Sequence, residues 1–144
     1  FELGQERTLH YALVPHAGDW RDAAVFRDGL ELNHPLLCRT VAPHAGRLPG
    51  RWGFLSVSAP GVVVSALDPT HDGDAVLRIY EATGRPASGV LVQVHARLES
   101  AREANLLEDA GKTLPVSDNA VRFDLRPFEI RTVRLHLHGN EISR

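Results

Sequence analysis

The stretch Leu67-Asp68-Pro69-Thr70-His71-Asp72-Gly73-Asp74-Ala75-Val76-Leu77-Arg78-Ile79-Tyr80-Glu81 decides the fold. It consists of the end of one strand, an acidic turn and the start of another strand. Asp and Gly relieve backbone strain in tight turns, which favours a hairpin here. The twelve-residue calcium loop with its distal glutamate is missing, so the sequence does not predict a calcium site at this turn.

Short alternating runs of apolar and polar residues recur on both sides of this hairpin, and Gly, Pro, Asp and Asn separate them. Alternation with a period of two is typical of strands that have one buried face. Pro60-Gly61 marks a turn between two such runs. Many short strands predict an all-β fold, an antiparallel β-sandwich. The runs are residues 8–14, 55–58, 62–67, 76–81, 90–96, 120–125 and 130–138.

One short helix is predicted near the N-terminus. Asp19 is a suitable N-cap, and good helix formers follow it from Trp20. The helix should end near Leu32, because a residue that precedes proline, here His34, avoids the helical region. Residues 101–108 are a second helix candidate by composition. The alternative is a connection within a β-domain, which can have a similar composition.

The composition describes an ordinary globular chain. It has 144 residues, of which 43% are hydrophobic and 24% charged, and its net charge is −2. We therefore expect a single soluble domain over residues 1–144, with no nucleic-acid or membrane partner. The chain opens at Phe1 and contains no methionine, which indicates a piece of a longer protein. We expect that protein to be cytoplasmic.

The single cysteine, Cys38, excludes an internal disulfide framework and a multi-cysteine metal site. It follows Pro35-Leu36-Leu37, and an apolar run of this kind predicts a buried, inert thiol. His136 and His138 share one face of a predicted strand, as zinc ligands can. No third ligand is evident, so no metal site is predicted. The alternative is a solvent-facing row of Arg131, Arg134 and the two histidines.

Three residues are candidates for contact with a sugar. The acidic turn could present Asp72 and Asp74 to sugar hydroxyl groups, because loops at the ends of sandwiches often carry binding groups. Trp52 lies between Gly50 and Gly53, and an exposed indole face stacks well on a sugar ring. Composition identifies no pair among the 18 acidic residues as glycosidase carboxylates, so no catalytic residue is predicted.

Several blocks, in order along the chain, resemble the C-terminal β-domain of family 38 glycoside hydrolases, the α-mannosidase family. Together they cover nearly the whole chain, and their joint order is specific. The blocks are Tyr11–Arg21, Glu31–Leu36, Ser65–Leu67, the acidic turn, Leu77–Glu81, Ala104–Glu108 and Pro127–Thr132.

This resemblance implies a non-catalytic C-terminal β-sandwich of a larger glycoside hydrolase. In that family a zinc ion and a carboxylate nucleophile act in an upstream α/β barrel. No block here resembles the barrel's His-x-Asp zinc motif, so no cofactor is assigned to this chain. The implied partners are the catalytic barrel of the same polypeptide and a mannoside at the rim of its site. The alternatives are a stand-alone carbohydrate-binding module and a structural interaction domain, which would have an exposed apolar patch.

Overall fold

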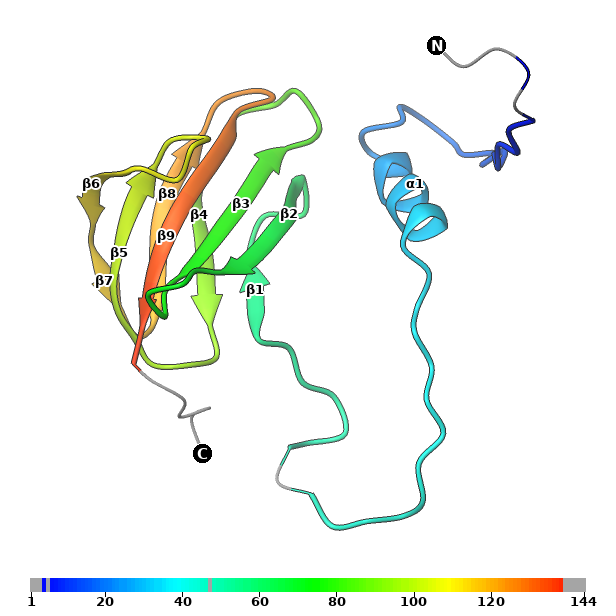
Figure 1. Cartoon of the computed structure of the whole chain (residues 1–144). Helices are drawn as coiled ribbons and strands as arrows, with labels where there is room; N and C mark the ends of the chain where they lie inside the picture. The colour runs from blue at the N-terminus through cyan, green and yellow to red at the C-terminus, as the bar shows by residue number, and fades with distance from the viewer. Residues whose placement is uncertain (1–3, 5, 47, 139–144) are drawn as a thin grey trace. The chain divides into compact units, whose positions relative to one another are not determined.

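The computed structural model describes residues 4, 6–46 and 48–138. The chain divides into two compact units, Phe1–Ala42 and Pro43–Arg144. The first unit contains helix α1 (Val25–Asn33), and the second contains strands β1 to β9. Figure 1 labels these elements. That one domain spans residues 1–144 stays a prediction.

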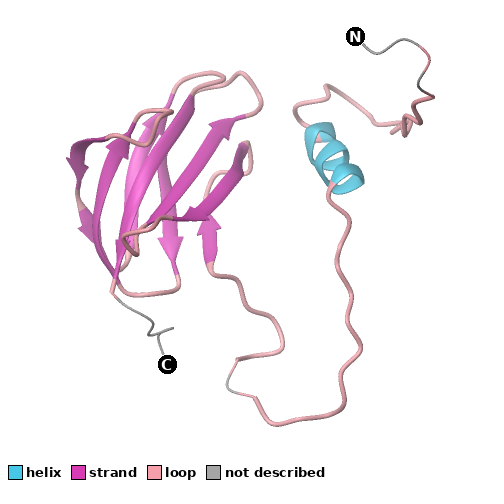
Figure 2. Cartoon of the chain, viewed as in Figure 1, coloured by secondary structure: helices cyan, strands magenta, loops and turns pink. Residues whose placement is uncertain are grey.

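The second unit is an antiparallel β-sandwich, as the sequence predicts (Figure 2). One sheet has the strand order β1-β4-β8-β7 and the other has the order β2-β3-β9-β5-β6. Every pairing between neighbouring strands is antiparallel. The strands are β1 (Leu55–Val57), β2 (Val62–Pro69), β3 (Ala75–Glu81), β4 (Ala87–Val94), β5 (Leu98–Ala104), β6 (Ala110–Leu114), β7 (Val116–Ser117), β8 (Ala120–Leu125) and β9 (Ile130–Leu137).

The acidic turn forms the predicted hairpin. Pro69 pairs with Ala75 across it, and the amide of Thr70 donates to the carbonyl of Asp74 at 2.8 Å. Gly73 has φ +87°, a conformation that costs little without a Cβ atom. The turn at Pro60-Gly61 has a different role, because β1 and β2 belong to different sheets. It carries the chain from one layer of the sandwich to the other.

The core lies between the two sheets and follows the alternation of the strands. Leu77, Val92 and Val121 are fully buried, as are Val133 and Leu135. They face inward because successive side chains of a strand point to opposite faces. The residues between them on β9, such as Arg134 and His136, therefore lie on the outer face of the five-stranded sheet.

The helix prediction is confirmed in kind and shifted in position. The side chain of Asp19 accepts the amide of Arg21 at 2.9 Å, as an N-cap does, but the residues before Val25 form turns. Ala24 has φ 54°, and this left-handed residue separates the turns from α1. The helix ends at Asn33, before proline, as expected. No helix in the described part of the chain is long and apolar enough to cross a membrane.

Two other interpretations are wrong. Residues 8–14 alternate as a strand would, yet they form no strand and remain exposed. Residues 101–108 are not a helix: they form the end of β5 and a turn. Pairing with β9 on one side and β6 on the other overrides helix propensity there. Asn105 closes the turn by accepting the amides of Leu107 and Asp109.

Candidate functional site

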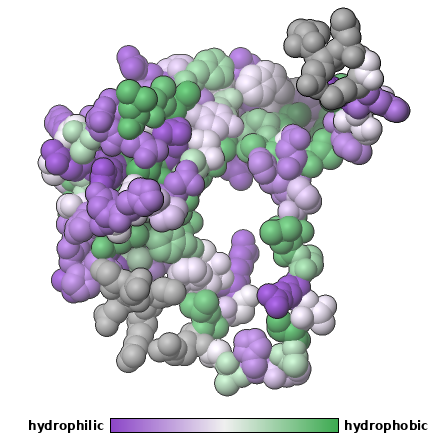
Figure 3. Space-filling view, in the orientation of Figure 1, coloured by the Kyte–Doolittle hydropathy of each residue, from purple (hydrophilic) through white to green (hydrophobic). Residues whose placement is uncertain are grey.

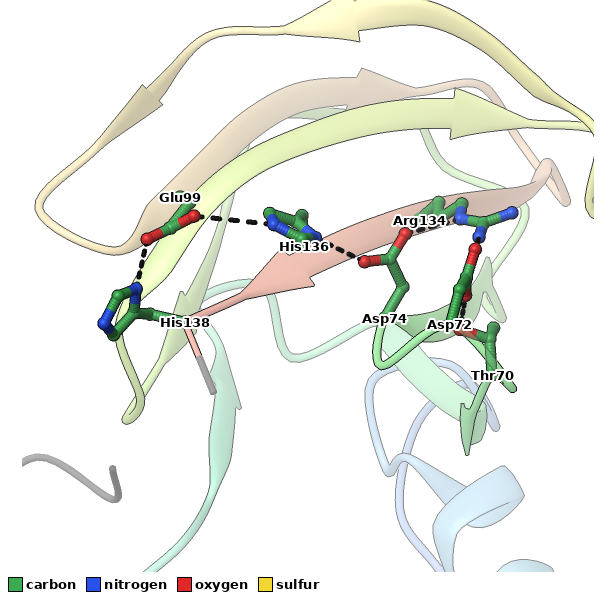
Figure 4. Close-up of polar contacts among 7 residues, drawn as sticks. All are labelled: Thr70, Asp72, Asp74, Glu99, Arg134, His136 and His138. Carbon is green, nitrogen blue, oxygen red and sulfur yellow. Dashed lines mark hydrogen bonds and ion pairs between the residues drawn. The ribbon is translucent and has the colours of Figure 1, made fainter. Parts of the chain in front are cut away.

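A line of charged side chains crosses the outer face of the five-stranded sheet, and we call it the ionic row (Figure 4). Its members come from three places: the β2–β3 turn, strand β5 and the end of β9. Each neighbouring pair in the row combines a carboxylate with an arginine or a histidine. The row consists of Asp72, Arg134, Asp74, His136, Glu99 and His138.

The topology of the sheet assembles this row. Strand β3 pairs with β9, and Ala75 lies opposite Leu135, so the turn before β3 reaches the last residues of β9. On the other side of β9, Ser100 of β5 lies opposite His136. Glu99 is the neighbour of Ser100, next to a register shift in this pairing, and its carboxylate contacts the row.

Arg134 ties both acids of the turn to the sheet. Its Nε donates to Asp74 Oδ2 at 2.7 Å, and its Nη2 donates to Asp72 Oδ2. The hydroxyl group of Thr70 also donates to Asp72, at 2.5 Å. Asp74 is the more enclosed of the two carboxylates, since 14% of its side chain is exposed against 61% for Asp72. The acidic turn thus directs both carboxylates toward a guanidinium group of the same chain.

The two histidines share one carboxylate. His136 Nδ1 lies 2.5 Å from Asp74 Oδ1, and its Nε2 lies 3.4 Å from Glu99 Oε2. The other oxygen of Glu99 contacts Nδ1 of His138. The two imidazoles are on one face, as predicted, and each is in contact with an acid. In the part of the chain that the structure describes, no group of three or more His, Cys, Asp or Glu side chains is arranged to hold a metal ion.

The contacts shift the pKa values of the row in the directions that favour charge. The carboxylate of Asp74 raises the pKa of His136 above its ordinary value. Partial burial of Asp74 opposes its ionisation, but hydrogen bonds from Arg134 and His136 outweigh burial and lower its pKa. The Thr70 hydroxyl lowers the pKa of Asp72, and His138 lowers that of Glu99. Every acid in the row is therefore held as a carboxylate.

The structure brings together two of the three predicted sugar contacts. Asp74 lines a shallow depression of about 390 Å³ together with Ser100, Arg102, Ala110, Arg134 and His136. Trp52 does not line this depression. Trp52 is 40% exposed, and its ring meets the ring of Phe54 edge to face, with 6.3 Å between centroids. Contact of Asp72, Asp74 and Trp52 with a sugar stays a prediction.

The predicted solvent-facing row is correct for Arg134 and the histidines and wrong for Arg131. Side chains an odd number of positions apart on a strand point to opposite faces. Arg131 and Arg134 are three positions apart, so they lie on opposite sides of β9. The guanidinium group of Arg131 lies 5.1 Å from the ring centroid of Phe123. It also forms ion pairs with Glu129 at 3.0 Å and Glu103 at 3.1 Å.

Sequence reasoning missed a buried carboxylate at the end of β3. Glu81 is 1% exposed, and its carboxylate accepts four hydrogen bonds. The donors are the amide and the hydroxyl group of Thr83, the amide of Gly84 and the amide of Phe128. It therefore joins the β3–β4 loop to the β8–β9 loop. We call this arrangement the Glu81 clasp. The signal was available, because Glu81 continues the inward-facing series of Leu77 and Ile79 with an acid.

The same end of the sandwich exposes large apolar side chains. Loops β3–β4, β5–β6 and β8–β9 meet there (Figure 1). We call it the loop end. Leu106, Leu107, Phe128 and Ile130 are each more than half exposed. At its rim Glu129 accepts the amide of Arg126, and this bond, with help from Arg131, lowers the pKa of Glu129 to about 2.

Comparisons with known proteins identify relatives of this chain. A family described as "Glycosyl hydrolases family 38 C-terminal beta sandwich domain" matches residues 61–133. The chain is 35% identical over 138 residues to α-mannosidase 2C1 of Mus musculus, a match that covers 90% of this chain and 13% of that protein. It is 34% identical over 136 residues to α-mannosidase 2C1 of Homo sapiens, which covers 88% of this chain and 12% of that protein. The chain thus spans about an eighth of the length of these relatives.

Proposed function

Since the chain belongs to the family of glycosyl hydrolase family 38 C-terminal β-sandwich domains, we propose that it serves as a non-catalytic domain of an α-mannosidase-like enzyme. Its role is structural: it packs on a catalytic barrel of the same polypeptide. The zinc ion and the carboxylate nucleophile of that enzyme belong to the barrel. The observation that carries the proposal is the family match over the sandwich, joined with relatives that are α-mannosidases.

The state of five carboxylates suits structural contacts. A glycosidase needs one carboxyl group that stays protonated near neutral pH, and its pKa must be raised for that purpose. Among the described residues, each resolved carboxyl shift is downward. The residues concerned are Asp72, Asp74, Glu81, Glu99 and Glu129. Each is an acceptor of hydrogen bonds and suits a structural contact better than proton donation.

The loop end supports the packing role. Exposed apolar side chains that gather on one surface mark interaction sites. Leu106 and Leu107 border a hollow whose opposite wall includes Ile130 and Arg131. A hollow with apolar walls and charged residues nearby has the usual composition of a protein interface. We assign this end to the contact with the barrel.

Activity of two purified proteins tests the catalytic part of the proposal. The first protein is the 144-residue chain, and the second is the longer polypeptide of the reading frame that contains it. Both are assayed with an aryl α-mannoside, with and without added zinc. We expect turnover, lost after chelation, from the longer polypeptide only. Zinc-dependent turnover by the 144-residue chain would refute the proposal.

Thermal melting tests the packing. Leu107→Asp adds a charge at the loop end, whereas His71→Asp adds the same charge at the exposed β2–β3 turn. Leu107→Asp should lower the melting temperature of the longer polypeptide and leave that of the 144-residue chain unchanged. His71→Asp should change neither. Equal effects of both substitutions on the longer polypeptide would contradict packing through the loop end.

Carbohydrate binding is the second candidate, and the depression beside Asp74 favours it. The depression offers a carboxylate, a hydroxyl group and two guanidinium groups within one surface, and such groups suit sugar hydroxyls. Calorimetric titration of the 144-residue chain with mannose and methyl α-mannoside tests it. Saturable binding that is lost in Asp74→Asn and kept in Trp52→Ala would support a sugar site in the depression. Titrations without a binding signal would contradict the sugar site, and the structural role would then be the single remaining proposal.

A further inference from the structure

We propose that residues 6–42 are a docking segment that folds against the rest of the mannosidase polypeptide. Residues 8–14 add an edge strand to a sheet of that partner, and residues 36–41 pack into an apolar groove beside it. The proposal rests on the proposed function, because the partner is the part of an α-mannosidase that lies outside this chain.

The first observation is the absence of a core. None of the described residues between positions 4 and 42 is buried. Leu9, Tyr11 and Leu13 are 84%, 87% and 88% exposed. These three alternate with His10 and Ala12, so an extended backbone places them on one face. Three large apolar side chains on one face of an extended segment form the binding pattern of a strand that completes another sheet.

The second observation lies on the other side of α1. Leu36 and Leu37 are 93% and 99% exposed, and Val41 is 61% exposed. Cys38, which the sequence predicts to be buried, is exposed as well. In Figure 3 hydrophobic residues stand out along the thin segment that follows α1. A run of this kind in a stable protein is covered by a partner, because each buried leucine gains about 2 kcal/mol relative to exposure.

The third observation is that α1 is short and that none of its described side chains is buried. Asp19 pairs with Arg21 at 2.8 Å, and the side chain of Asn33 donates to the carbonyl of Gly29 at 2.7 Å. Isolated helices shorter than about 12 residues are marginal in water, and α1 has 9. Its stability in a native protein must come from burial against something else.

The fourth observation is the different extent of the two sequence matches. The family match begins at residue 61. The match to α-mannosidase 2C1 covers 90% of the chain, so it includes most of residues 1–42. The relatives therefore carry most of residues 1–42 together with far more polypeptide than this chain has. That additional polypeptide is the occupant to which the proposal commits.

Hydrogen–deuterium exchange, followed by mass spectrometry, tests the pairing. We compare peptides from residues 6–15 in the 144-residue chain and in the longer polypeptide. The amides should exchange freely in the first and be protected on the order of 100-fold in the second, as strand amides with stable partners are. Alkylation of Cys38 by iodoacetamide, measured on its own peptide, should fall in parallel. Peptides from β3 and β9 serve as the reference.

Two matched substitutions test the face. Leu13→Asp places a charge on the apolar face, and His10→Asp places it on the opposite face of the same run. Leu13→Asp should abolish protection of residues 6–15 in the longer polypeptide without changing the melting of the 144-residue chain. His10→Asp should leave protection in place.

Three outcomes would overturn the proposal. One is free exchange of residues 6–15 in the longer polypeptide. Another is protection already present in a monomeric 144-residue chain, which would mean docking on its own sandwich. The third is protection that appears only in dimers of the 144-residue chain. Mannosidase activity of the longer polypeptide shows which proposal fails. If the longer polypeptide is active and residues 6–15 exchange freely, only the docking proposal is refuted. If it is inactive and residues 6–15 are protected, only the proposed function is refuted.

Discussion

Removal of the Glu81 carboxylate should destabilise the sandwich more than any surface charge does. Glu81→Ala leaves the amides of Thr83, Gly84 and Phe128 without their acceptor in a site that is 1% exposed. Each unpaired buried amide costs at least about 1 kcal/mol. The three together predict a loss of about 3 kcal/mol in the free energy of unfolding, or roughly 12 to 24 °C in melting temperature for a domain of this size.

Glu81→Gln and Glu108→Gln make the test specific. Glutamine keeps one oxygen acceptor but turns its NH₂ group toward donors, so we expect about half the loss, roughly 1.5 kcal/mol. Glu108 is 44% exposed and lies 3.7 Å from Arg78. Its conversion to glutamine should cost less than about 0.5 kcal/mol. Urea titration of the 144-residue chain, followed by circular dichroism, measures all three variants.

The pH dependence of the clasp has a definite sign. Burial of Glu81 opposes its ionisation, yet hydrogen bonds from Thr83, Phe128 and Gly84 lower its pKa. A carboxyl group with a lowered pKa stabilises the fold above its unfolded pKa, and the contribution disappears as the pH falls through the folded value. Stability of the wild type should therefore fall below about pH 4.5, the ordinary glutamate range, more steeply than that of Glu81→Gln. A loss below 1 kcal/mol in Glu81→Ala, or equal acid sensitivity of both proteins, would refute the clasp.

Three further predictions concern His136, Gly84 and Leu77. Asp74→Asn should lower the pKa of His136 toward its ordinary value, as measured by NMR titration of the ring; in the wild type this histidine stabilises the fold below its unfolded pKa, and the effect is lost as the pH rises through the raised value. Gly84→Ala should cost about 2 kcal/mol in urea titrations, because φ is +71° and a Cβ atom would lie 2.5 Å from a ring carbon, whereas Gly50→Ala, which meets nothing within 4 Å, should be neutral. Leu77→Ala should cost about 3 kcal/mol by the same method, since the side chain is fully buried.

The strands that could be predicted from sequence are those that carry a simple pattern. β8 alternates regularly over Ala120–Leu125, and β3 and β4 are rich in apolar residues. β5 was not predicted, because the composition of residues 101–108 also suits a helix and a register shift in the pairing with β9 interrupts the alternation of β5. β6 has one buried residue, Leu114, so no alternation marks it.

The candidate site was visible only as separate pieces. The acidic turn and the two histidines of β9 were both noted in the sequence. Their contact depends on the pairing of β3 with β9, and Asp74 and Arg134 are 60 residues apart. Spacing along the chain cannot reveal a partner at that separation. It also could not show that both acids of the turn form ion pairs with Arg134.

The contrast between the two units is what links fold to function. In the second unit, no buried side-chain nitrogen or oxygen among the described residues lacks a hydrogen-bond partner, and the Glu81 clasp supplies acceptors where loops would otherwise be unsatisfied. In the first unit, Leu13 and Leu37 are 88% and 99% exposed. We therefore expect the sandwich to fold by itself and the docking segment to need the rest of a mannosidase, since the family match begins at residue 61 whereas the match to α-mannosidase 2C1 covers 90% of the chain.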